Sequence, residues 1–192
     1  MIVLASKSAS RRAMLEAAGV NFEARPADVD ERALESAMEG APPEEVALKL
    51  AEAKALAVRE NTWPVLGSDS LVVVDGQRFD KPASREEAAA HLRAFSGRTM
   101  QLHSAAAFAK GGKIVWRHAA RADLTVRDLS EAFIESYLGH EWPEVGYCVG
   151  VFRIEARGPQ LFTSIEGDQF TVLGMPLLPV LEALRELGEL PR

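Results

Sequence analysis

The stretch from Val65 to Pro82 carries the side chains that are hardest to explain by folding alone. It reads VLGSDSLVVVDGQRFDKP, and its apolar run with the turn dipeptide Asp75-Gly76 predicts a buried strand that returns as a hairpin. Asp69 lies inside the run, and a lone carboxylate in a core is costly unless it is paired, binds a metal or faces a cavity. Lys81 follows the hairpin, so the stretch predicts either a buried Asp69 to Lys81 ion pair or a functional site.

Hydroxyls and cations gather near the start of the chain. Ile2 to Ala5 predicts a short strand, and a helix beginning near Arg11 follows it. Ser6, Ser8 and Arg11, with the free backbone N–H groups of the helix start, are groups that hold phosphate. Capping of the helix by serine is the structural alternative. The glycine patterns of a P-loop and of a dinucleotide fingerprint are absent, so neither chemistry is supported.

Three further charged residues are candidates with an ordinary alternative each. Lys54 lies on the apolar stripe of a helix that opens after Pro43, so it either reaches to solvent along its stem or points at an anion in a cavity. Glu31 closes the acidic run that begins at Asp28, which is either a solvated loop or a source of metal ligands. Glu155 follows an expected short strand and is either solvated or part of a site.

Composition limits the class of protein. The 192 residues are 47% hydrophobic, enough to bury a core in one domain or in two lobes that share a sheet. The net charge of −6 and the lack of a basic cluster disfavour a nucleic-acid partner. The single cysteine, Cys148, excludes an internal disulfide and a cysteine-built zinc site. No segment resembles a signal peptide or a membrane span, so we expect a cytoplasmic protein with no membrane partner.

The remaining patterns predict the elements around these residues. Ser84 to Glu87 is a capping box that begins a helix ending before Gly97, and Ser130 begins another that ends at Gly139. Strands are expected at Thr99 to Ala109, Ile114 to Val126, Phe152 to Ile154, Gln160 to Ile165 and Phe170 to Leu173, and a helix after Pro176. Glu166-Gly167-Asp168 is expected as a turn between two of these strands, and Asp168 either braces it or reaches the site.

Four blocks in order resemble the Maf (septum-formation-like) family of nucleoside triphosphate pyrophosphatases. They are LASKSASRRAML, GSDSLVVVDGQRFDKP, FSGRT and IEGD with VLGMPL. The resemblance implies an α/β fold: a single domain over residues 1–192 with a long twisted mixed sheet, helices on both sides and two lobes around a cleft, as in inosine triphosphatases. It also implies a homodimer, and a house-cleaning hydrolase that cleaves a nucleoside triphosphate between its α and β phosphates with a divalent cation.

The resemblance gives the candidate residues their roles. Asp69, Lys81 and Lys54 are expected to be catalytic, since hydrolysis needs an activated water and neutralised phosphate charge. Asp69 and Glu31 are expected to hold Mg²⁺ or Mn²⁺, and whether Asp69 is a metal ligand or the general base stays open. The phosphates are expected to contact Ser6, Ser8 and Arg11.

The segment from Phe152 to Glu155 looks like the subfamily that acts on 7-methyl-GTP. A carboxylate such as Glu155 accepts from both N1–H and the N2 amino group of guanine, whereas a uracil or thymine edge offers one donor. Ser10 departs from the pattern, because dTTP and UTP pyrophosphatases carry arginine there and the 7-methyl-GTP subfamily carries tryptophan. The ring that stacks on the base is therefore open among Phe152, Trp63 and Trp142.

Two alternatives remain open on the sequence. One is a dTTP or UTP pyrophosphatase of the same family with altered base contacts. The other is a non-catalytic protein that senses a nucleotide and regulates cell division through a partner. An aspartate beside repelling phosphates is more useful for chemistry than for sensing, so the intact Asp69 and Lys81 favour the enzyme.

Overall fold

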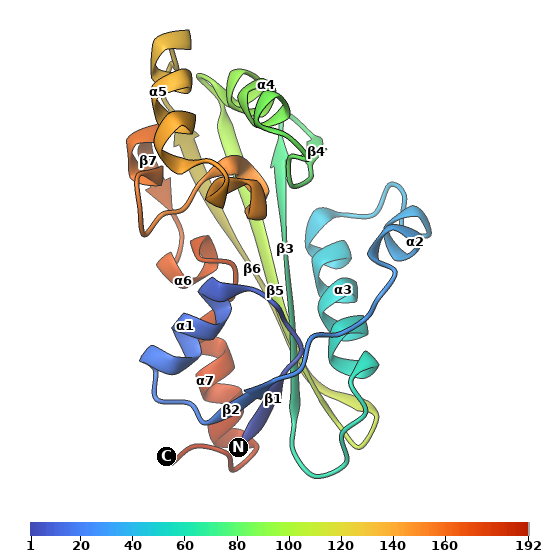
Figure 1. Ribbon diagram of the computed structural model, residues 1–192. Helices are drawn as coiled ribbons and strands as arrows, with labels where there is room; N and C mark the ends of the chain where they lie inside the picture. The colour runs from blue at the N-terminus through green and yellow to red at the C-terminus, as the bar shows by residue number, and fades with distance from the viewer. Residues whose placement is uncertain (192) are drawn as a thin grey trace. The chain divides into compact units, whose positions relative to one another are not determined.

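The chain divides into two compact units. The computed structural model describes residues 1–191 (Figure 1). Unit 1 comprises Met1–Ser70, His103–Ala120 and, in its described part, residues 168–191. Unit 2 comprises Leu71–Leu102 and Arg121–Gly167. Each unit is assembled from separate stretches, so neither corresponds to one continuous segment of the sequence.

Seven strands form one mixed sheet in the order β2, β1, β3, β5, β6, β7, with β4 paired to β3. Their bounds are Ile2–Leu4 (β1), Phe22–Ala24 (β2), Val65–Val74 (β3), Gln77–Phe79 (β4), Thr99–Lys110 (β5), Lys113–Val126 (β6) and Phe162–Glu166 (β7). β1 is parallel to both β2 and β3, with Val3 beside Val65, whereas β3 with β4 and β6 with β7 are antiparallel. The expected α/β class with a mixed sheet is confirmed.

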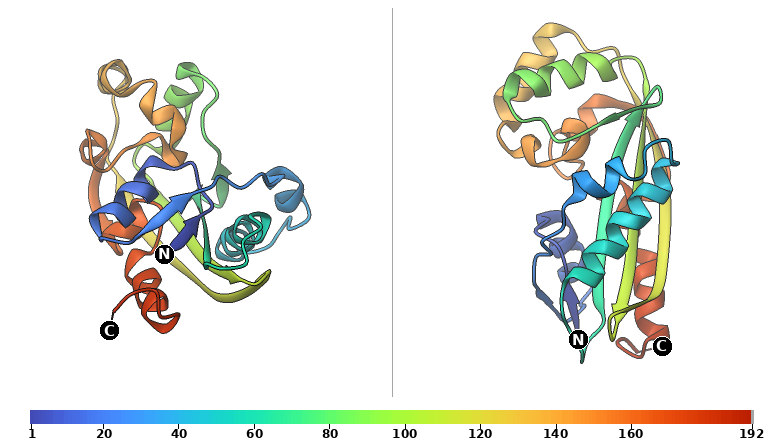
Figure 2. Two further views of the ribbon diagram at one scale, coloured as in Figure 1. Left: turned by 60° about the horizontal axis from the view of Figure 1, so that its bottom comes forward. Right: turned by 90° about the vertical axis from the view of Figure 1, so that its right-hand side faces the viewer.

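In unit 1, helices cover both faces of the strands. These helices are α1 (Ala9–Ala17), α2 (Glu31–Ser36), α3 (Pro43–Ala57), α6 (Gln169–Val172) and α7 (Leu177–Glu186). Successive strand residues point to opposite faces, so Leu4 and Leu66 pack with α1 and α7, while Val3 and Val65 pack with Ala55 of α3. Figures 1 and 2 both show α3 on the opposite side of the strands from α7. Each fully buried leucine in these layers stabilises the fold by about 1.5–3 kcal/mol.

A glycine lets α3 approach β3 unusually closely. A Cβ on Gly67 would lie 2.1 Å from the carbonyl oxygen of Ala51 and 2.5 Å from the backbone nitrogen of Ala55. Both neighbours are helix backbone and cannot turn aside. The glycine therefore sets the distance between the helix that carries Lys54 and the strand that carries Asp69.

Replacement of Gly67 by Ala is expected to lower the free energy of unfolding by about 3 kcal/mol, because α3 must move away from the strand. Urea unfolding measures the change. Gly139→Ala is the matched control, since a Cβ there meets open space on helix α5 (Glu131–Glu141), and it is expected to be neutral or stabilising by about 0.5–1 kcal/mol. Equal unfolding midpoints for wild type and Gly67→Ala would show that the close approach is not required.

Unit 2 contains the expected hairpin and two of the expected helices. Asp75 and Gly76 have φ angles of 50° and 77°, the left-handed pair that a two-residue hairpin turn needs. Helix α4 (Arg85–Phe95) begins at the predicted capping box, with Ser84 Oγ accepting from the Glu87 amide at 3.2 Å. Helix α5 packs beside α4 and begins, as predicted, at Ser130. Short 3₁₀ turns occupy Glu144–Tyr147, Val149–Val151 and Gly158–Leu161.

Two of the expected strands are wrong. Residues 170–173 lie in α6 and its C-terminal end, because Asp168 accepts a hydrogen bond from the Thr171 amide and so starts a helix. Residues 152–154 follow a 3₁₀ turn whose Gly150 and Val151 have φ angles of 81° and 56°, and they belong to none of the seven strands. Short apolar runs do not distinguish a strand from a helical turn, which is why both were assigned incorrectly.

Within residues 1–191, no helix is both long enough and apolar enough to cross a bilayer.

Candidate active site

The Asp69 carboxylate is buried and paired. Asp69 lies in the unit 1 part of β3 with 7% of its surface exposed, and its Oδ1 accepts a hydrogen bond from Lys54 Nζ at 2.5 Å. Lys54 reaches it from the last turn of α3, so this lysine points inward rather than to solvent. The sequence suggested Lys81 as the ion-pair partner of Asp69, whereas the structure pairs this carboxylate with Lys54. Removal of Lys54 would leave the Asp69 carboxylate in the interior without its ammonium partner.

Glu31 joins the same ammonium group. It is the first residue of α2, and its Oε1 lies 2.9 Å from Lys54 Nζ. Two carboxylates around one ammonium leave a net negative charge and unused oxygen lone pairs. Within residues 1–191, no group of three or more His, Cys, Asp or Glu side chains could enclose a metal. The pair nonetheless fits Mg²⁺ or Mn²⁺, since Mg²⁺ is usually bound by one or two carboxylates together with water and substrate phosphates.

The Arg11 guanidinium forms three hydrogen bonds, all to neutral acceptors. Its Nε donates to the Gly174 carbonyl at 3.0 Å, Nη2 to Ser70 Oγ at 3.1 Å and Nη1 to Ser6 Oγ at 3.4 Å. Burial lowers the pKa of Arg11, and the negative charges of Asp69 and Glu31 oppose that shift. These influences show that Arg11 lies close to the carboxylate pair. A half-buried cation with neutral partners is suited to receive an anion.

The two serines expected at the phosphate site, Ser6 and Ser8, form different hydrogen bonds. Ser8 Oγ accepts from the Arg11 amide at 3.4 Å and caps α1, so the structural alternative is correct for this hydroxyl. Ser6 Oγ accepts from the Ser8 amide at 3.1 Å and from Arg11 Nη1, and it thereby joins the helix start to the guanidinium. Unit 1 thus brings together Ser6, Arg11, Glu31, Lys54 and Asp69.

Lys81 and Glu155 belong to unit 2. Burial raises the pKa of the Cys148 thiol, the charge of Glu155 raises it further, and the charge of Lys81 opposes both. The two charged side chains therefore lie near the same thiol. Both are exposed and have room to contact a ligand. Their joint action with the unit 1 residues stays a prediction.

Helix α5 fixes the segment that precedes Glu155. Arg153 donates through Nε and Nη2 to Glu141 Oε2 at 3.1 and 3.0 Å, and Glu141 is only 3% exposed. One turn earlier, the Tyr137 hydroxyl donates to the Val151 carbonyl at 3.1 Å, and burial raises its pKa. Arg153 therefore forms an ion pair with the buried Glu141, and Glu155 is not part of that ion pair.

Phe152 is buried rather than presented to a ligand. It is 6% exposed, and its ring packs edge-on against Phe162 with centroids 5.0 Å apart. Trp63 and Trp142 are half-buried, and the Trp142 ring lies against Gly146. Tyr147, in the same unit, is an exposed aromatic residue, at 72% exposure.

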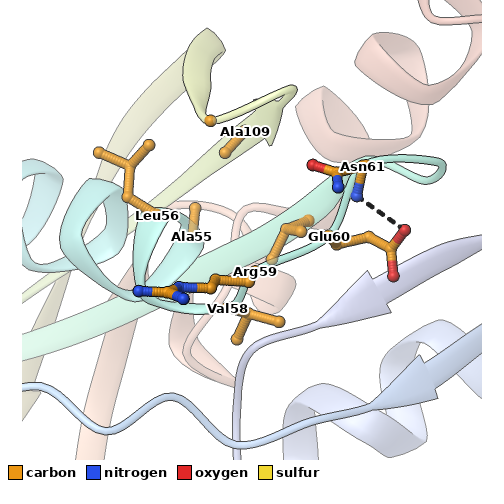
Figure 3. A pocket seen from close by; sticks show the side chains of 9 residues that line it. Ala55, Leu56, Val58, Arg59, Glu60, Asn61 and Ala109 are labelled. Atoms are coloured by element: carbon orange, nitrogen blue, oxygen red, sulfur yellow. Dashed lines mark hydrogen bonds between the residues drawn. The ribbon is translucent and has the colours of Figure 1, made fainter.

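A pocket of about 200 Å³ lies in another part of unit 1 (Figure 3). It is lined by Ala55, Leu56, Val58, Arg59, Glu60, Asn61, Val65, Ala109 and Gly112, none of which is a candidate site residue. Glu60 accepts from the Thr62 amide at 2.7 Å, from Arg25 at 2.8 Å and from the Asn61 and Trp63 amides, which holds its pKa at about 2. These bonds order the turn after α3, so the carboxylate has a structural role.

Comparison with known proteins identifies the family of the chain. The family model described as Maf-like protein matches residues 1–187. The chain belongs to the Maf-like protein family. The resemblance drawn from four short blocks is thereby confirmed over nearly the whole length of this Maf-like protein.

Several relatives of this Maf-like protein share almost half of its residues. The 7-methyl-GTP pyrophosphatase of Rhizobium meliloti (strain 1021) is 47% identical over 98% of this chain and 96% of its own length. The 7-methyl-GTP pyrophosphatase of Mesorhizobium japonicum is 50% identical over 97% of this chain and 96% of its own length. The nucleoside triphosphate pyrophosphatase of Gluconobacter oxydans is 47% identical over 97% of this chain and 94% of its own length. Among solved structures, a HAM1 protein from Coxiella burnetii is 18% identical, with a TM-score of 0.40 over 65% of this chain and 72% of that one.

Proposed function

We propose that this Maf-like protein is a metal-dependent nucleoside triphosphate pyrophosphatase that releases a nucleoside monophosphate and pyrophosphate. The observation that carries the proposal is the buried Asp69 carboxylate paired with Lys54, whose ammonium also binds Glu31, close to the half-buried Arg11. A carboxylate fixed next to an anion-binding cation serves hydrolysis of a phosphoanhydride, whereas binding alone has no use for it. The names of relatives from Rhizobium meliloti and Gluconobacter oxydans support the same reaction class.

In this proposal each of the unit 1 residues has a separate role in the reaction. Asp69 accepts the proton of the attacking water or, with Glu31, holds Mg²⁺ or Mn²⁺, which supplies positive charge to the phosphate oxygens when bound. Lys54 orients the Asp69 carboxylate, because its ammonium is the hydrogen-bond donor to Oδ1. Arg11, with Ser6, receives the phosphates through the N–H groups that its three internal bonds leave unused. Lys81 keeps its expected role as a catalytic cation.

The proposed substrate is 7-methyl-GTP or a related guanine nucleotide. Glu155 is exposed, and its backbone segment is anchored from α5 by Tyr137 and Glu141. Since Arg153 is held by Glu141, the Glu155 carboxylate is available to accept from the two donors on the guanine edge. Relatives named 7-methyl-GTP pyrophosphatase agree with this preference. We further propose that the protein acts in the cytoplasm as a homodimer.

The substrate proposal is tested by kcat/KM for pyrophosphate release with Mg²⁺ or Mn²⁺ across 7-methyl-GTP, GTP, UTP, dTTP and CTP. We expect 7-methyl-GTP to be preferred. Preference for UTP or dTTP would contradict the assignment of Glu155 and identify a pyrimidine nucleotide pyrophosphatase. Tight metal-dependent binding without release of pyrophosphate from any of them would instead indicate a nucleotide sensor.

Glu155→Gln is expected to lower the ratio of kcat/KM for 7-methyl-GTP over UTP by about 10- to 100-fold, because the amide can accept from only one of the two guanine donors. Turnover of UTP should change little. Glu144→Gln, an exposed glutamate of the same unit, is the control and should leave the ratio unchanged. An unaltered ratio in Glu155→Gln would show that another group reads the base.

A further inference from the structure

A chain of two serines links Arg11 to helix α6. Arg11 Nη2 donates to Ser70 Oγ at 3.1 Å, and Ser70 Oγ lies 3.0 Å from Ser104 Oγ. Ser104 is fully buried, at 0% exposure, and its hydroxyl donates to the Thr171 carbonyl at 2.9 Å. All of these residues belong to unit 1.

The hydroxyl protons of this chain have several acceptors within reach. Arg11 can only donate, and the Thr171 and Gly174 carbonyls can only accept. Ser70 Oγ accepts from Arg11 and lies 2.9 Å from the Gly174 carbonyl and 3.0 Å from Ser104 Oγ, so its single proton is shared between these two acceptors. The two hydroxyls thereby join the guanidinium to backbone carbonyls, and the charge of the arginine strengthens these hydrogen bonds.

A backbone carbonyl of the turn after α6 forms a second contact with the Arg11 guanidinium. The Gly174 carbonyl accepts from Arg11 Nε at 3.0 Å, and a Cβ on Gly174 would lie 3.3 Å from Ser70 Oγ. Gly174 has a φ of 101°, which side chains rarely adopt. Glycine thus lets this carbonyl and the serine contact one arginine together.

Asp168 fixes the turn that supplies both carbonyls. Its Oδ2 accepts from the Thr171 amide at 2.9 Å and from Thr171 Oγ1 at 3.2 Å, which caps α6. The Gly174 amide in turn donates to the Thr171 carbonyl at 3.0 Å. The cap, the short helix and the Gly174 carbonyl therefore form one hydrogen-bonded unit around Arg11.

We infer that Ser104 and Asp168 are positioning residues for Arg11, and that they orient its guanidinium toward a polyphosphate through Ser70 and the turn at Thr171 to Gly174. The inference rests on the proposed function for its ligand. By count of donors, one N–H on each terminal nitrogen of Arg11 remains for the anion. Ser104 and Asp168 do not touch the substrate themselves.

The test measures calorimetric binding of inorganic tripolyphosphate to the full chain in the presence of Mg²⁺. Ser104→Ala and Asp168→Ala are each expected to weaken binding by about five- to tenfold, as a charge-assisted contact loses its support. Asp168→Asn keeps the capping oxygen and should stay within about twofold of wild type. Ser130→Ala is the matched control, because it removes a helix cap of the same kind as Asp168 but from α5 in unit 2, and its affinity should also stay within about twofold.

A double-mutant cycle separates positioning from a purely structural role. In an Arg11→Ala background, Ser104→Ala and Asp168→Ala should cause no further loss of tripolyphosphate affinity. Additive losses, or variants with a lower melting temperature and wild-type affinity, would overturn the inference. Failure of the wild type to bind tripolyphosphate would overturn it as well. Pyrophosphate release from nucleotides is measured separately, so a protein that binds tripolyphosphate and shows the cycle but hydrolyses nothing would retain the inference and refute the proposed function.

Discussion

Asp69→Asn is expected to lower kcat for pyrophosphate release by about three orders of magnitude while the fold stays intact. The amide has the shape of the carboxylate and still accepts from Lys54, but it neither takes a proton from water nor neutralises a metal ion. Steady-state assays with 7-methyl-GTP and Mg²⁺ give the loss, and circular dichroism with thermal unfolding gives the state of the fold.

Asp75→Asn is the matched control for this variant. Asp75 lies in the turn at the end of the same strand, and asparagine tolerates its left-handed φ of 50°. The control should retain activity within about twofold, since a surface change away from a site is close to neutral. Full activity of Asp69→Asn would remove Asp69 from the mechanism in either of its two proposed roles.

Lys54→Met is expected to lower kcat/KM by about 100-fold or more and also to destabilise the fold. It leaves Asp69 buried beside Glu31 with no cation between them, and an unpaired buried charge costs about 3–5 kcal/mol. Kinetics with 7-methyl-GTP and urea unfolding measure the two effects. Lys49→Met, on the same helix with a side chain 56% exposed, should change neither strongly.

The double variant Lys54→Met with Asp69→Asn distinguishes the two effects. Stability should recover, because no buried carboxylate at position 69 remains unpaired, whereas activity should stay lost. If Lys54→Met alone retained both activity and stability, the ion pair would be neither catalytic nor structural, and the arrangement in unit 1 would need another explanation.

Local sequence signals predicted the fold well where the deciding contacts are between residues close together in the sequence. The Asp75-Gly76 hairpin, the capping box at Ser84 and the cap at Ser130 all rest on hydrogen bonds within four residues, and all three are confirmed. The wrong strand at residues 170–173 has the same origin. A four-residue apolar run fits either state, and the deciding cap from Asp168 was interpreted as part of a turn.

Contacts between distant residues could not be derived from spacing. Asp69 and Lys54 were both suspected, but their pairing across 15 residues depends on the close approach that Gly67 permits. The partners of Arg11 lie up to 163 residues away in the sequence, and two of them are a backbone carbonyl and a small hydroxyl that no pattern identifies as functional. Phe152 was chosen for its aromatic character, and only its packing against Phe162 shows that the ring is buried.

The most direct test of the account is the identity of the products released from 7-methyl-GTP by the purified protein with Mg²⁺. The account predicts 7-methyl-GMP and pyrophosphate in equal amounts, with product formation abolished by Asp69→Asn and unaffected by Asp75→Asn. Release of 7-methyl-GDP and orthophosphate, or no product from any nucleoside triphosphate, would contradict the proposed reaction.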